Sequence, residues 1–132
     1  MTTFGTLGIA ASGMTVDRKW LDAVSDNLAN IDTARSTSQP AYEAKYIVAS
    51  EMSGGGVQVA GAVTSGNATG RVVYEPDNPL ADAQGNVRYP DVDMSSQMVQ
   101  LIMAQRGYQA NAAVVDRAKD AYESALKIGQ NL

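Results

Sequence analysis

Two apolar stripes, one near each end of the chain, constrain its fold more than any other feature. Both repeat with a spacing of seven residues. The first stripe consists of Leu7, Met14, Leu21, Val24, Leu28 and Ile31. Apolar residues at the a and d positions of a heptad are typical of an α-helix that packs along another helix. We therefore predict a helix from about residue 5 to residue 30, in which Asp17 is the one mismatch of the stripe.

The second stripe is longer and is interrupted by Gln105 and Lys119. It consists of Met94, Met98, Leu101, Tyr108, Val115, Tyr122 and Leu126. The pattern predicts a helix over residues 94–128, with a length of about 50 Å at about 1.5 Å per residue. Asp93 or Asp91 is placed to cap its start, and Gly129 is placed to end it.

The segment between the stripes is rich in turn-forming residues and has no helical period. Its apolar runs predict short strands at 46–48, 57–63 and 71–74. The glycines at 54–56 predict a turn, residues 75–86 a loop, and Val87–Pro90 a lead into the second helix. The expected organisation is an N-terminal helix (1–34), a small irregular or β insert (35–92) and a C-terminal helix (93–132).

The two stripes can bury each other if the helices pair, but this pairing leaves other apolar residues exposed to solvent. A second row, from Ala110 to Ile128, flanks the C-terminal stripe, and Gly5, Gly8 and Gly13 weaken the N-terminal helix. Copies packed side by side would supply the missing cover. Periodicity alone leaves two interpretations open: the core of an ordinary helical domain, and packing between molecules.

The composition excludes several classes of function. The chain has no cysteine and no histidine, so disulfides, thiolate nucleophiles and histidine bases or metal ligands are absent. Its net charge of −4 argues against nucleic-acid binding. It lacks an apolar run of about 18 residues, so we expect no membrane span. We expect no conventional secretory signal either, because no basic residue precedes Arg18.

Two sequence motifs resemble those of the bacterial flagellar axial proteins, the family of rod and hook subunits. The first is SDNLAN at residues 25–30, which is similar to the signature near the N-terminus of that family. The second is YEPDNPLADAQGNVRYP at 74–90, which resembles the segment before the C-terminal helix of the proximal-rod type. RGYQAN at 106–111 continues the likeness.

The resemblance implies a mainly α fold, in which the terminal helices form an antiparallel coiled-coil-like pair in an inner tube and the insert lies outside. It also implies a structural role, not an enzymatic one: a subunit of the proximal rod, which crosses the periplasm as a drive shaft around the export channel. The implied partners are copies of the chain, other rod proteins, and the base ring and export gate. Export would use the flagellar type III system. A soluble helical adaptor or export-linked binding protein is the alternative.

The predicted site is a set of packing surfaces, with no catalytic residue, metal or cofactor. The two stripes would pack against other subunits. The polar residues expected at these interfaces are Asn27, Asn30, Arg106, Gln109 and Asn111. Our hypothesis is that the amides of Asn27 and Asn30 bond backbone carbonyls or neighbouring subunits where the first helix ends, and simple capping is the alternative. The acidic residues at 75–82 are interpreted as a solvated loop.

Overall fold

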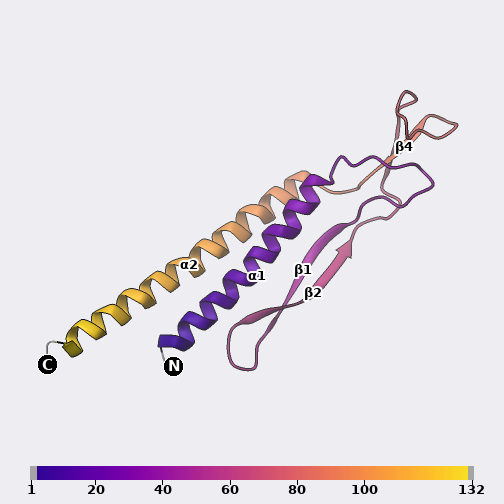
Figure 1. Cartoon of the computed structure of the whole chain (residues 1–132). Coiled ribbons are helices and arrows are strands. Elements are labelled where there is room, and N and C mark those ends of the chain that lie inside the picture. Colours follow the sequence, from indigo (N-terminus) through magenta and orange to yellow (C-terminus); the bar gives the residue numbers. More distant parts are fainter. Residues whose placement is uncertain (1–2, 131–132) are drawn as a thin grey trace.

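The computed structural model describes residues 3–130 as two long helices joined by two β-hairpins (Figure 1). The elements are α1 (Thr3–Ala29), β1 (Ala44–Glu51), β2 (Val57–Ser65), β3 (Arg71–Tyr74), β4 (Asn86–Tyr89) and α2 (Met94–Gln130). Terminal helices with a small strand insert are therefore confirmed. Residues 1–2 and 131–132, which the predicted end segments include, lie outside the described residues.

Two local predictions were wrong. Residues 87–89 do not simply lead into the helix, because they belong to β4 and pair with β3 across a hairpin. Gly129 does not end α2, which continues through it to Gln130. The predicted cap at Asp93 is confirmed, since its Oδ2 accepts bonds from the backbone N–H and the hydroxyl of Ser96, at 2.7 and 2.6 Å.

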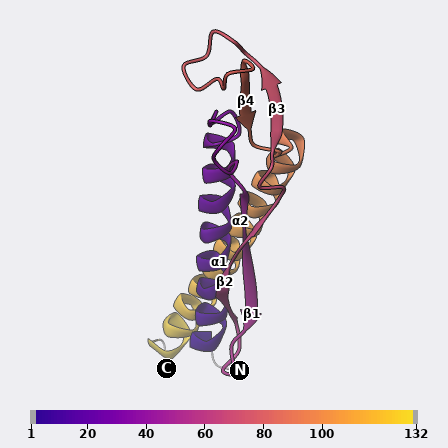
Figure 2. The ribbon, with the colours of Figure 1, turned by 90° about the vertical axis from the view of Figure 1, so that its right-hand side faces the viewer.

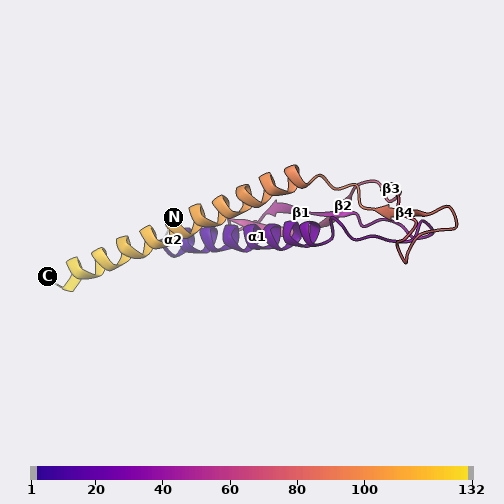
Figure 3. The same cartoon turned by 90° about the horizontal axis from the view of Figure 1, so that it is seen from above.

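The two helices lie side by side and run in opposite directions, so the start of α1 and the end of α2 are at the same end of the molecule (Figure 1). Side-chain contacts between them follow this direction, from Asn27 with Gln97 at one end to Asp17 with Asn111 further along. α2 has 37 residues and α1 has 27, and the last turns of α2 project past the start of α1 (Figure 3). The antiparallel pair is thus present, while a coiled-coil geometry stays a prediction.

The β1–β2 hairpin lies along α1 (Figure 2). Its turn touches the first half of the helix. Gly55 and Gly56 have φ of 90° and 97°, which favours glycine, and Gly56 passes so close to Ser12 that a side chain at 56 would meet the hydroxyl. Ser12 Oγ accepts a bond of 3.0 Å from the backbone N–H of Val57. The glycine run is therefore a turn fitted against the helix.

The β3–β4 hairpin lies beyond the end of the helix pair (Figure 2). Arg35 extends it, because its backbone exchanges two hydrogen bonds with Arg88. Val87 is fully buried in this region. Gly70, with φ of 58°, lies directly against the carbonyl of Tyr89, which leaves no room for a side chain.

The described chain has a thin interior and a large surface. Most of its buried apolar residues are alanines, joined by Val24, Ile31 and Val87. The accessible surface is 8585 Å². A compact globular protein of the same mass has about 6,700 Å² by the usual scaling of area with mass. The elongated chain therefore exposes about 1,900 Å² more surface than a compact domain of its size.

Candidate assembly site

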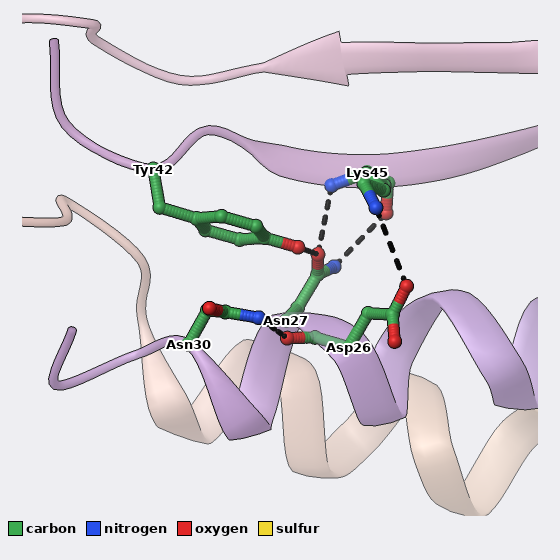
Figure 4. Close-up of polar contacts among 5 residues, drawn as sticks. All are labelled: Asp26, Asn27, Asn30, Tyr42 and Lys45. Carbon is green, nitrogen blue, oxygen red and sulfur yellow. Dashed lines mark hydrogen bonds and ion pairs between the residues drawn. The ribbon is translucent and has the colours of Figure 1, made fainter.

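Asn27 of the SDNLAN motif is fully buried and uses both ends of its amide inside the chain (Figure 4). Its Nδ2 donates to the carbonyl of Lys45 and to Oε1 of Gln97, each at 2.9 Å. Its Oδ1 accepts from the backbone N–H of Lys45 at 2.8 Å and from the hydroxyl of Tyr42 at 2.9 Å. One side chain thus contacts β1 and α2 from its position on α1.

Asn27 acts on β1 as a neighbouring strand would, because it pairs with both the N–H and the C=O of Lys45. This satisfies backbone groups that a helix alone could not reach. Gln97, which is only 1% exposed, carries the network to Tyr46 of the same strand at 3.4 Å. Burial raises the pKa of Tyr42 above its ordinary value. The cluster joins the three elements at one point.

Asn30 makes local contacts, in contrast to Asn27. Its Nδ2 donates to the carbonyl of Asp26 at 2.8 Å, and its Oδ1 accepts from the hydroxyl of Thr33 at 3.3 Å. These bonds lie at the last turn of α1 and the following turn, which is where a helix leaves carbonyls unpaired. Both asparagines therefore donate to a backbone carbonyl, but only Asn30 keeps part of its surface open to a neighbour.

Further along the helix pair, a glycine of each helix faces a polar side chain of the other. A methyl group at Gly13 would lie 2.6 Å from Nδ2 of Asn111, and one at Gly107 would lie 2.9 Å from Oδ1 of Asp17. The two polar side chains also bond each other, from Asn111 Nδ2 to Asp17 Oδ2 at 2.9 Å. The mismatch at Asp17 is therefore part of the helix contact. Sequence reasoning missed it, since Gly13 was interpreted only as a weak point.

The apolar stripe of α1 is mostly covered within the chain. Val24 and Ile31 are buried, and Leu7, Met14, Leu21 and Leu28 are half-buried. The stripe of α2 is covered only in its middle, at Leu101, Tyr108 and Val115. Both ends of that stripe are exposed: Met94, Met98, Tyr122 and Leu126.

Other large apolar side chains of α2 are exposed outside the predicted stripe: Val99, Ile102, Met103, Val114 and Ile128. The signal for the first three was the run of apolar residues from 98 to 103, which only Gln100 interrupts and which is too dense for a single stripe of the helix. Arg106 and Gln109 are also exposed on α2, and Asn111 is half-buried. The role of these residues in subunit contacts stays a prediction.

The acidic loop before β4 is tied by internal bonds. Glu75 accepts bonds from Asn78 and Tyr89. Asp82 accepts the backbone N–H groups of Gln84 and Asn86 and the hydroxyl of Thr37, and these bonds, chiefly the one from Asn86, hold its pKa below the ordinary value. Residues 3–130 contain no acidic cluster suited to a metal ion. Neither of their long helices is apolar enough to cross a bilayer.

Comparison with known proteins matches both ends of the chain to flagellar families. Residues 7–35 match the family described as flagella basal body rod protein, and residues 83–128 match the C-terminal region of the flagellar basal body rod FlgEFG proteins. The flagellar basal-body rod protein FlgC of Escherichia coli O6:H1 is 38% identical over 98% of this chain and all of its own length. The chain belongs to the FlgC family of flagellar basal-body rod proteins.

The same similarity extends to other bacteria. FlgC of Salmonella typhimurium LT2 is 38% identical, and FlgC of Bacillus subtilis 168 is 33% identical, each over 98% of this chain and the whole relative. Members of the FlgC family are structural proteins of the flagellar basal-body rod, not enzymes. The chain is therefore a structural component of that rod, and its surfaces are to be judged as surfaces for assembly.

Proposed function

We propose that the chain is a subunit of the proximal rod and that it assembles through its terminal helices. In this role it contributes to the drive shaft that crosses the periplasm, transmits torque and encloses the export channel. Its neighbours would be copies of itself, the other proximal and distal rod proteins, and the base ring and export gate of the motor. We further propose that it reaches the rod through the flagellar type III system without a cleaved signal peptide.

The observation that carries this proposal is the uncovered apolar surface of α2. A single chain leaves Met94, Met98, Tyr122 and Leu126 about half exposed, although they belong to the stripe that packs on α1 further in. Exposed apolar faces of this extent are typical of protein–protein contacts. The surface in excess of a compact domain, about 1,900 Å², is enough for two contacts at about 800 Å² per partner.

The test introduces a charge into this surface at an exposed position, where the substitution should leave the fold of the single chain unchanged. Leu126 is 47% exposed in the last turns of α2. We expect Leu126→Glu to abolish swimming and to remove the subunit from purified basal bodies, because a carboxylate would have to be buried between subunits. Leu126→Met is the matched control and should swim normally.

Two results would contradict the proposal. One is normal swimming of the Leu126→Glu strain with the variant present in its basal bodies. The other is absence of the unaltered chain from basal bodies while it accumulates in the cytoplasm, which is the behaviour of a soluble adaptor. The circular dichroism of both purified variants should match that of the unaltered chain, so that loss of assembly is separated from loss of folding.

A further inference from the structure

Two arginines lie directly opposite each other where residue 35 pairs with β4. The backbones of Arg35 and Arg88 exchange two hydrogen bonds, of 2.8 and 2.9 Å. Residues paired in this way are about 5.5 Å apart at their Cα atoms and place their side chains on the same face. The chain thus sets two like charges side by side, on the β3–β4 hairpin beyond the end of the helix pair (Figure 2). Such a pair destabilises a sheet unless something offsets the repulsion.

The same two arginines are the least exposed cationic side chains of the chain. Of its ten lysines and arginines, eight are exposed, and only Arg35 and Arg88 are half-buried. The ion pairs of residues 3–130 are all made by lysines, and neither of these arginines has a carboxylate oxygen within 4.0 Å among those residues. A charge that is partly removed from water is costly when no counter-charge accompanies it.

One carbonyl of the loop at residues 36–40 holds each guanidinium in place. Nη1 of Arg35 donates to the carbonyl of Pro40 at 3.1 Å, and Nη1 of Arg88 donates to the carbonyl of Gln39 at 3.0 Å. A carbonyl accepts a hydrogen bond but does not neutralise the charge. Nε of Arg88 is buried without a hydrogen-bond partner, which is true of no other side-chain nitrogen or oxygen among the described residues. Most of the ten N–H donors of the two groups therefore stay unused.

Arg71, on the opposite face of the same hairpin, has a different environment. It pairs with Tyr89, and its guanidinium lies 5.5 Å from the centre of the tyrosine ring. Its side chain is also exposed. Water and an aromatic ring therefore accommodate this charge without an acid. The Arg35–Arg88 pair has less access to water and no such ring contact among the described residues.

Exposed side chains of β3 lie on the same face as the arginine pair. Val72 is directly opposite Arg88 and is 52% exposed, and Tyr74, two residues further along, is 69% exposed. Arginine and tyrosine are enriched at protein–protein interfaces, and an exposed apolar neighbour gains from being covered by a protein and not from a free anion. We name this surface, made of Arg35, Arg88, Val72 and Tyr74, the hairpin face.

We propose that the hairpin face binds an acidic side chain of a neighbouring rod subunit, whose carboxylate lies between Arg35 and Arg88. This proposal rests on the proposed function and specifies a contact outside the terminal helices. Planar guanidinium groups match the two oxygens of a carboxylate, and one carboxylate between them reduces their mutual repulsion. The acid comes from another molecule because none of the described chain reaches the pair. Such a contact adds specificity to an assembly that gains most of its free energy from apolar surface.

The first experiment is a competition between two chains. Arg35→Gln/Arg88→Gln removes both charges and keeps amide donors for the loop carbonyls. It is expressed together with an equal amount of the unaltered chain, and the ratio of the two in purified basal bodies is measured by mass spectrometry. We expect the variant to be about tenfold under-represented, because it lacks the charge-assisted hydrogen bonds of the contact. Arg71→Gln, in the same hairpin, is the matched control and should be incorporated as well as the unaltered chain.

The free chain separates this role from a role in folding. The purified double variant should melt within 2 °C of the unaltered chain or above it, because the substitution removes repulsion and breaks no ion pair of the described residues. A clearly lower melting temperature would show that the pair serves the fold itself, and this would overturn the proposal.

The second experiment identifies the carboxylate. Arg88→Lys keeps the charge and supplies an amine, which a carbodiimide joins to a contacting carboxylate as an amide, with loss of water. Treatment of intact basal bodies should give a peptide that links the new lysine to an aspartate or glutamate of another subunit. Arg71→Lys is the control and should give no such link.

Three results would overturn the proposal and leave the proposed function standing. One is equal incorporation of the double variant and the unaltered chain. Another is the same cross-link of Arg88→Lys in the purified, unassembled chain, which would place the acid within the molecule. The third is equal incorporation together with a melting temperature of the unaltered chain, but not of the double variant, that rises with added acetate, which would indicate a site for a free anion. Absence of the unaltered chain from basal bodies would refute the proposed function instead.

Discussion

Replacement of Asn27 by alanine should be far more damaging than the same replacement three residues later. Alanine at 27 removes four hydrogen bonds at a fully buried position. The hydroxyl of Tyr42 can turn to water because its side chain is only half-buried. The backbone N–H and C=O of Lys45 and the amide oxygen of Gln97 lose their partner without such a replacement.

The cost follows from these three groups. A buried polar group left without its partner costs about 1–3 kcal/mol, and values near the lower end apply to groups that can relax in part. For the three groups together, Asn27→Ala should therefore lower the free energy of unfolding by about 3–4 kcal/mol. Asn30→Ala removes two local bonds at a partly exposed position and should cost about 0.5–1 kcal/mol. At about 3–5 °C per kcal/mol for a chain of this size, between the ranges for smaller and larger domains, the two melting temperatures should differ by roughly 10 °C.

The assay is thermal unfolding of the purified chain, followed by circular dichroism, with hydrogen exchange as a local measurement. In Asn27→Ala the amide of Lys45 should exchange faster, because its N–H no longer donates to Oδ1 of residue 27. The same amide should keep its protection in Asn30→Ala. If the two variants melt within 2 °C of each other, with equal protection of Lys45, the cluster does not join α1 to β1 as the structure indicates.

Two further predictions concern the helices. Gly8→Ala should raise the free energy of unfolding by about 0.5–1 kcal/mol, because alanine favours the helix and nothing lies within 4 Å of the new methyl, whereas Gly13→Ala should lower it by pushing on the amide of Asn111. Thermal unfolding of the two variants gives the sign of each change in the free energy of unfolding. A Gly13→Ala variant more stable than the unaltered chain would refute close packing of Gly13 against Asn111. Acid should destabilise the first turn of α2. Hydrogen bonds from Ser96 to the carboxylate of Asp93 hold the pKa of Asp93 below its ordinary value. The stabilisation that these bonds give to the folded chain is therefore present above the unfolded-state pKa of Asp93 and is lost as the pH falls through its folded-state pKa. Hydrogen exchange of the first turn of α2 should rise across that acid range, and Asp93→Asn should show no such rise.

The helices were predictable from sequence because their signal is local and repeated. The heptad spacing of both stripes places α1 and α2 nearly at their observed bounds, and the cap at Asp93 is a single residue before the helix. β4 was not predictable in the same way. Its four residues, Asn86–Tyr89, alternate polar and apolar side chains, but so short a run does not predict a strand by itself. They form a strand because β3 and the backbone of Arg35 pair with them.

The asparagine cluster was predictable only in part, for a similar reason. Two asparagines near a helix end indicate polar contacts, and the sequence places Asn27 and Asn30 three residues apart. The sequence does not tell them apart, because the partners of Asn27 lie on β1 and α2, 18 and 70 residues away. Only the approach of these elements makes one asparagine a buried link and leaves the other as a local cap.

The chain separates the contacts that define its own shape from those available to neighbours. Inside, small and polar residues set the register: Asn27 with Gln97, and Asp17 with Asn111 against a glycine of the facing helix. Outside, α2 keeps its large apolar residues exposed at both ends. Hydrogen bonds give specificity at modest net free energy, while burial of apolar surface gives the larger gain on association. Variants should therefore fall into two groups: Asn27→Ala lowers the stability of the free chain, whereas Leu126→Glu leaves that stability unchanged and lowers incorporation into the rod.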